Sequence, residues 1–136
     1  MPPLDEVIVS PWTMSATVTS ILHWNLIPIF ADINEDDFCL DPKDVEKKIS
    51  KRTKALVPVH YAGHPADMKA LKKIAKVHDL SIVEDAATAV GTEYSGKKIG
   101  NENHSVCFSF HPIKNMTTGD GGMLTTNDKK TFIKNR

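Results

Sequence analysis

Two side chains in this sequence have surroundings that favour chemistry, and Lys114 is the first. It lies in the segment C-F-S-F-H-P-I-K-N-M-T-T-G-D-G-G, beside apolar residues and not on a charged face. Burial beside apolar groups favours the neutral amine, which is a nucleophile that forms Schiff bases. The glycines at 119, 121 and 122 allow close backbone approach or a positive φ. The alternative interpretation is an ordinary surface lysine in a flexible loop.

Asp85 is the second candidate. It ends an apolar run and precedes Ala86 and Ala87, so a flat molecule has room to approach its carboxylate. The alternative is a residue that only caps a turn, which is a common role for aspartate. Both interpretations remain open at this point.

Other catalytic patterns receive little support. His60 and His64 are four residues apart, but Gly63 and Pro65 interrupt any helix between them, so we do not expect a zinc site. The G-x-S-x-G, Walker A and G-x-G-x-x-G motifs do not occur. The sequence therefore argues against an α/β-hydrolase, a P-loop nucleotidase and a Rossmann dehydrogenase.

Short apolar runs alternate with helical patterns, and these elements must position the candidate residues. The strand-like runs lie at 6–9, 27–31, 54–59, 80–84, 105–110 and 123–126. Helical patterns lie at 13–24, after Asp41-Pro42, after 65–67 and from 127–128 onward. Ser95-Gly96 predicts a hairpin turn.

Strands that are separated by helices pair in parallel, so the fold class is α/β, with a mostly parallel sheet flanked by helices. Ligands bind at the carboxyl ends of such strands. The segments 10–13, 60–64, 85–88 and 109–114 each follow a strand, and we expect them to meet there.

Composition sets further limits. The 136 residues suit one domain, and 17 basic residues balance 17 acidic ones, which argues against a nucleic-acid binder. No apolar run is long enough to span a membrane, and the N-terminus does not resemble a secretory signal. Cys39 and Cys107 are far apart in apolar settings, so we expect two reduced thiols in a cytoplasmic protein.

The order and spacing of eight segments are specific when they are taken together. They are D-E-V-I-V-S-P at 5–11, W-T-M-S-A-T at 12–17, P-I-F-A-D-I at 28–33, R-T-K-A-L-V-P-V-H at 52–60, G-H-P-A-D-M at 63–68, E-D-A-A at 84–87, F-S-F-H-P-I-K at 108–114 and G-D-G-G at 119–122. With them the chain resembles the DegT/StrS family of pyridoxal-phosphate-dependent sugar aminotransferases, which has the fold type I of aspartate aminotransferase.

The resemblance implies a role for each matched residue. Lys114 matches the lysine that forms the covalent aldimine with pyridoxal 5'-phosphate and later moves a proton. Asp85 matches the partner of the pyridine nitrogen, which keeps that nitrogen protonated so that the ring accepts electrons. Ser109 matches a serine that binds the cofactor phosphate. Thr88 stands where glutamine or histidine is usual near the phenolic oxygen, and Met14 where an aromatic residue stacks on the ring.

The resemblance also implies an activity, the transfer of an amino group from a donor such as glutamate to a keto group of a nucleotide-linked sugar. Lys114 argues against the dehydratase branch of the family, which has histidine there. Residues 1–136 match the central part of the large domain, without the N-terminal phosphate-binding part and the C-terminal small domain. A homodimer or higher homo-oligomer is expected. The alternative is a catalytically incompetent module of the family that oligomerises or regulates.

Overall fold

A six-stranded sheet forms the centre of the computed structural model, which describes residues 3–134. The strands are β1 (Glu6–Val9), β2 (Ile27–Phe30), β3 (Thr53–Val57), β4 (Ser81–Asp85), β7 (Ser105–Ser109) and β8 (Gly122–Thr125). Their order is β2-β1-β3-β4-β7-β8, with parallel pairing throughout except between β7 and β8. The expected α/β fold with a mostly parallel sheet is confirmed.

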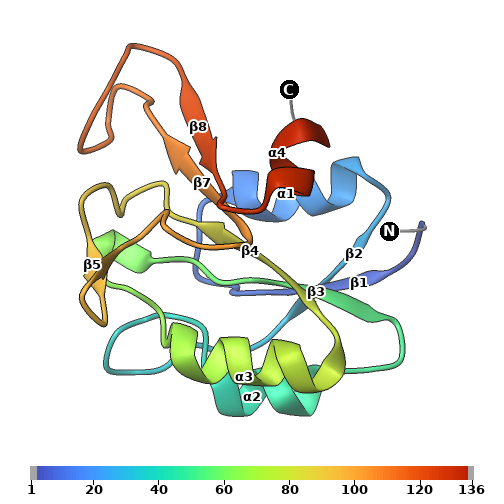
Figure 1. Ribbon diagram of the computed structural model, residues 1–136. Helices are drawn as coiled ribbons and strands as arrows, with labels where there is room; N and C mark the ends of the chain where they lie inside the picture. The colour runs from blue at the N-terminus through green and yellow to red at the C-terminus, as the bar shows by residue number, and fades with distance from the viewer. Residues whose placement is uncertain (1–2, 135–136) are drawn as a thin grey trace.

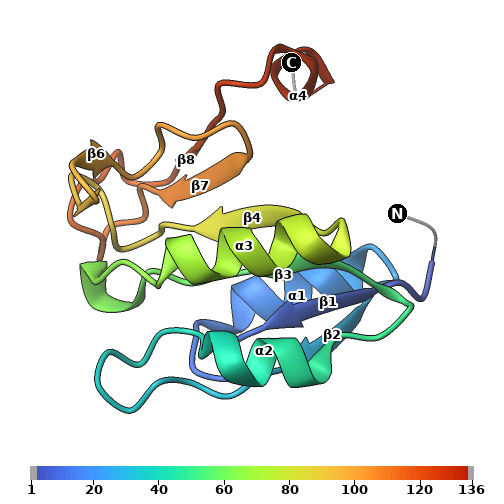
Figure 2. The same ribbon diagram turned by 60° about the horizontal axis from the view of Figure 1, so that its bottom comes forward.

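Helices cover both faces of this sheet. The helices α2 (Pro42–Lys48) and α3 (Met68–His78) lie together on one face, and α1 (Ser15–His23) lies on the opposite face (Figures 1 and 2). The short helix α4 (Lys129–Lys134) follows β8. A separate hairpin joins β5 (Glu93–Tyr94) and β6 (Lys97–Lys98). It turns at Ser95-Gly96 with positive φ at both residues, which confirms the predicted hairpin.

Strand β1 is buried on both of its faces, and its alternate side chains point to opposite sides of the sheet. On β1, Ile8 packs in the core cluster that includes Leu71 of α3. Val7 and Val9 pack on the other face with Ile21 of α1. Each of these β1 side chains is at most 2% exposed, so β1 is fixed between the two helical layers.

Local signals set where the helices begin. Pro42 is the first residue of α2, and the Asp41 side chain accepts a hydrogen bond from the Lys43 backbone N–H at 2.9 Å, as the sequence predicts. Helix α1 begins at Ser15, two residues later than expected, because Met14 keeps an extended backbone with φ −60° and ψ 139°. The turn between β1 and α1 is therefore longer than predicted and leaves Met14 outside the helix.

Candidate functional site

The carboxyl ends of four parallel strands surround one cavity of about 330 Å³. Each of the four expected segments contributes residues to its wall, and two further wall residues, Met14 and Val59, lie one position outside those segments. The lining residues are Thr13 and Met14 after β1, Val59, Tyr61 and Ala62 after β3, Asp85, Ala87 and Thr88 at and after the end of β4, and Lys114 after β7. The expectation that these loops meet at one edge of the sheet is confirmed.

Asp85 is the last residue of β4, and its carboxylate is firmly held. Its Oδ2 accepts a hydrogen bond from the Thr17 hydroxyl at 2.7 Å, and its Oδ1 accepts one from the Ala87 backbone N–H at 3.0 Å. Its backbone also bonds to Pro58 and His60. Asp85 therefore caps the turn after β4 and also lines the cavity, so its functional role stays a prediction.

Lys114 lines the same cavity from the loop after β7. Its backbone N–H donates to the His111 carbonyl oxygen at 2.9 Å, which closes a turn. The lysine is half-buried, and the neighbouring Ile113 is 78% exposed. The apolar neighbours in the sequence therefore do not enclose Lys114, because the loop lies on the surface.

Thr88 lines the cavity, but its hydroxyl hydrogen is already used. Thr88 Oγ1 donates to the His60 carbonyl oxygen at 3.1 Å, so the hydroxyl has only lone pairs left for a ligand. Ser109 does not line this cavity, and its Oγ lies 3.4 Å from the His111 backbone nitrogen, which donates to it. The structure thus brings together Met14, Asp85, Thr88 and Lys114, with Ser109 at the base of the same loop.

An aromatic cluster lies beside the cavity. The ring centroid of Trp12 is 6.2 Å from that of Phe38 and 6.2 Å from that of Tyr61. Trp12 therefore packs against other rings, and the cavity wall holds Met14, which is 67% exposed. Tyr61 and Ala62 belong to a short 3₁₀ turn, η1 (Tyr61–Gly63), that we did not predict. The only feature of the sequence that pointed to Tyr61 and Ala62 as residues of the site was their position in the segment after β3.

The two histidines of the doubtful zinc pair point to different places. His60 is fully buried against Glu84, whereas the His64 side chain is 61% exposed and 3.9 Å from Asp37. Within residues 3–134 no cluster of metal-ligating side chains occurs.

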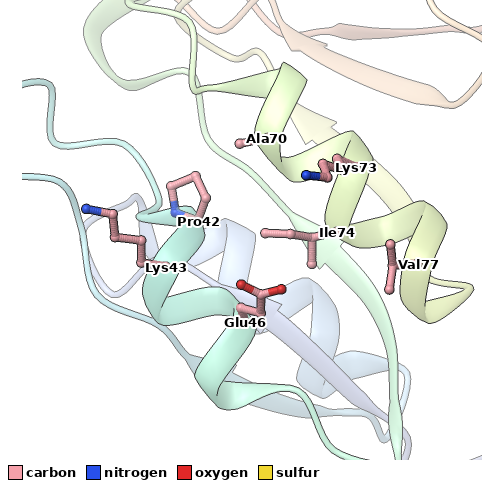
Figure 3. Close-up of a pocket in the computed structure, with 7 residues that line it drawn as sticks. All are labelled: Pro42, Lys43, Glu46, Ala70, Lys73, Ile74 and Val77. Atoms are coloured by element: carbon pink, nitrogen blue, oxygen red, sulfur yellow. The ribbon is translucent and has the colours of Figure 1, made fainter.

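Two other hollows lack this convergence of strand ends. A groove of about 210 Å³ lies between α2 and α3, where Glu46 and Lys73 flank Ile74 and Lys43 extends away from α3 (Figure 3). A larger hollow of about 690 Å³ is lined mainly by the acidic loop and helix start at 32–47. We therefore take the cavity at the strand ends as the candidate site, because polar side chains from four loops meet there.

Comparison with known proteins identifies the family. The sequence profile of the DegT/DnrJ/EryC1/StrS aminotransferase family matches residues 1–136. This chain belongs to that family. The resemblance drawn from the sequence motifs is thereby confirmed.

Its relatives include proteins of polysaccharide and sugar metabolism. The chain is 46% identical to the spore coat polysaccharide biosynthesis protein SpsC of Bacillus subtilis over 98% of this chain and 34% of that protein. It is 41% identical to the GDP-perosamine synthase of Escherichia coli over 94% of this chain and 35% of that protein. The chain therefore spans about a third of the length of these relatives.

Solved structures of other proteins share the fold. DesV of S. venezuelae, crystallised with a ketimine intermediate, matches 98% of this chain and 36% of its own with a TM-score of 0.95 and 44% identity. NtdA of Bacillus subtilis, crystallised with the cofactor PMP, matches 96% of this chain and 29% of its own with a TM-score of 0.87 and 34% identity. Membership of an aminotransferase family implies pyridoxal phosphate as the cofactor.

None of the helices between residues 3 and 134 is long and apolar enough to cross a membrane.

Proposed function

We propose that this chain forms the cofactor-binding core of a pyridoxal-phosphate-dependent aminotransferase. The enzyme transfers an amino group from an amino acid, such as glutamate, to a keto group of a nucleotide-linked sugar. The observation that carries the proposal is the meeting of Asp85 and Lys114 at one cavity, although they are 29 residues apart and belong to different loops. The sugar-metabolising relatives support the substrate class.

The residues of the cavity fit this cofactor. A volume of about 330 Å³ lies at the lower end of the range of small-ligand sites. Lys114 supplies the amine that would hold the cofactor covalently. Asp85 supplies a carboxylate for the ring nitrogen, and a hydrogen-bond donor holds each of its two oxygens. Pyridoxal phosphate, when bound, supplies an electron sink for a carbanion.

Each of these residues would have its own role in the reaction. Asp85 would hold a proton at the ring nitrogen, and Lys114 Nζ would move a proton at the reacting carbon. Met14 would contact the ring, since a thioether makes a favourable contact with an aromatic system. Ser109 would bind the phosphate at the base of the Lys114 loop, and Thr88 would contribute only lone pairs.

The sheet edge and the cysteines bear on the assembly and the location. We infer a homo-oligomer, because one end of the described sheet, β8, has a single neighbour and its side chains are partly exposed. We infer a cytoplasmic protein, because Cys39 and Cys107 are both free. Residues 1–136 would form part of the large domain.

Trapping the cofactor on Lys114 tests the function. The chain is mixed with pyridoxal phosphate, reduced with borohydride and mapped by mass spectrometry. We expect one adduct, on Lys114, and a visible absorbance band that Lys114→Ala removes completely. The matched control Lys97→Ala changes an exposed lysine of β6 and should keep both.

The opposite outcome supports the other candidate. Adducts that scatter over the lysines, or a band that persists in Lys114→Ala, would contradict the proposed site. The chain would then be better described as an incompetent module of the family. The position of Ser109 outside the cavity is the observation that favours this alternative.

A further inference from the structure

Thr17 ends one of the matched segments, but the resemblance assigns no role to it. It lies in the first turn of α1, is 7% exposed, and donates its hydroxyl hydrogen to Asp85 Oδ2 at 2.7 Å across 68 residues of sequence. Valine has nearly the same shape and would fill the same space among the apolar contacts of α1. The hydroxyl therefore does something that packing does not require.

Thr17 is also the middle of a chain of hydrogen bonds. Its Oγ1 lies 2.9 Å from the Oγ1 of Thr13, which lines the cavity. Because a threonine hydroxyl has one hydrogen and that of Thr17 goes to Asp85, Thr13 must be the donor in this pair. The order is thus Thr13 to Thr17 to Asp85, with every hydrogen directed toward the carboxylate.

Two donors of different origin fix the orientation of the carboxylate. Thr17 binds Oδ2 from α1, and the Ala87 backbone N–H binds Oδ1 from the turn after β4. A hydroxyl bond to an ionised carboxylate is shorter and stronger than a neutral one. With both oxygens held, the carboxylate cannot rotate about its side-chain bonds, and its remaining lone pairs keep one direction in the cavity.

We propose that Thr17 is a positioning residue that orients Asp85 for the ring nitrogen of the cofactor. This inference rests on the proposed function for the identity of the ligand. Its geometric part, the restraint of the Asp85 side chain by Thr17, stands on the contacts of the chain itself.

Cofactor binding to three variants tests the inference. Thr17→Val should weaken the affinity for pyridoxal phosphate about tenfold, as expected for a lost bond to a charged group. Thr17→Ser keeps the hydroxyl and should stay within about twofold of the unchanged chain. In a chain that already carries Asp85→Asn, adding Thr17→Val should weaken the affinity much less than tenfold, because Thr17 acts through the carboxylate.

Other results would overturn it. If Thr17→Val binds as well as the unchanged chain, or weakens binding equally in the Asp85→Asn background, Thr17 does not act through Asp85. Circular dichroism shows whether Thr17→Val folds, and Thr17→Ala serves for the same comparison if it does not.

Amide exchange of Ala87 provides a readout without cofactor. If Thr17 holds the carboxylate, Thr17→Val frees Asp85 and the Ala87 amide should exchange several times faster, while Thr17→Ser leaves the rate unchanged. An unchanged rate in Thr17→Val refutes the positioning role. If the unchanged chain binds no cofactor but the Ala87 rate responds, the proposed function fails while the restraint of Asp85 by Thr17 is confirmed.

Discussion

Glu84 and Asp85 are neighbours on β4, and the alternation of a strand gives them opposite surroundings. Asp85 faces the candidate site, whereas Glu84 is fully buried between two histidines. His60 Nδ1 accepts a hydrogen bond from the Ala66 backbone N–H at 3.1 Å, so the His60 hydrogen is on Nε2 and is donated to Glu84 at 2.8 Å. Glu84 thus joins the loop after β3 to the residue before β7.

This buried carboxylate should make stability depend on pH. Burial alone raises the pKa of Glu84, but the hydrogen bonds from His104 and His60 outweigh it and lower the pKa from 4.5 to about 2. A lowered pKa contributes stability that is present above the unfolded value near 4.5 and is lost as the pH falls toward 2. The contribution at neutral pH is about 3 kcal/mol.

Unfolding in urea at pH 7 and at pH 3 measures that contribution. Glu84→Gln should lower the free energy of unfolding at pH 7 by about 2 kcal/mol and should lose less stability on acidification than the unchanged chain. The control Glu93→Gln removes a solvent-exposed carboxylate that pairs with Lys98, and it should behave almost like the unchanged chain. Equal losses on acidification in the unchanged chain and in Glu84→Gln would contradict the assignment.

The sequence predicted which residues meet at the site when their positions depend only on the ends of parallel strands. Asp85 and Lys114 each follow a strand, and parallel strands end at one edge, so their meeting could be foreseen. The Thr17 contact could not, because it depends on how α1 is rotated about its axis over the sheet. The exposure of Ile113 was also hidden, since apolar neighbours in the sequence do not show which way a loop faces.

Among the elements, helix starts were better predicted than loop conformations. Asp41-Pro42 marked the start of α2 because a capping side chain and a first-turn proline are local features. The 3₁₀ turn at Tyr61–Gly63 was not foreseen, since Ala62 adopts a φ of 50°, which alanine rarely does without support from its surroundings. Local rules thus predict the elements, and tertiary contacts decide the loops that line the site.

The start of α3 gives a prediction at this scale. Asp67 Oδ1 accepts from the Ala70 backbone N–H at 3.1 Å and from the Tyr94 hydroxyl at 2.9 Å, so it caps α3 and fastens the β5–β6 hairpin. Asp67→Ala should lower the free energy of unfolding by about 2 kcal/mol. Asp41→Ala removes a cap without a hairpin contact and should cost about 1 kcal/mol.

Thermal and urea unfolding compare these variants with Tyr94→Phe. Tyr94→Phe should destabilise the unchanged chain by about 1 kcal/mol and the Asp67→Ala variant by less, because the shared bond is already gone. Additive losses in the double variant would show that Asp67 acts on the helix alone.

The molecule as a whole exposes an apolar patch at the β8 end of the sheet. Met116 and Met123 are both nearly half exposed and, with Phe108 and Phe110, line a hollow of about 410 Å³. Among residues 3–134, β8 pairs only with β7, so its other edge offers unpaired backbone groups. The net charge of zero does not oppose association.

We therefore expect the chain to self-associate through this patch. Sedimentation velocity over a range of concentrations should show a mass above that of a monomer.

Met123→Lys should raise the dissociation constant of the self-associated chain about tenfold, because it places a charge in an apolar contact. Val77→Lys is the control, since Val77 is an exposed residue of α3 that does not line the hollow and has Lys76 beside it in the chain. If both variants associate like the unchanged chain, the contact lies elsewhere. If the unchanged chain is monomeric at all concentrations, the homo-oligomer inference fails for this chain, while the assignment of Lys114 still depends on the cofactor adduct.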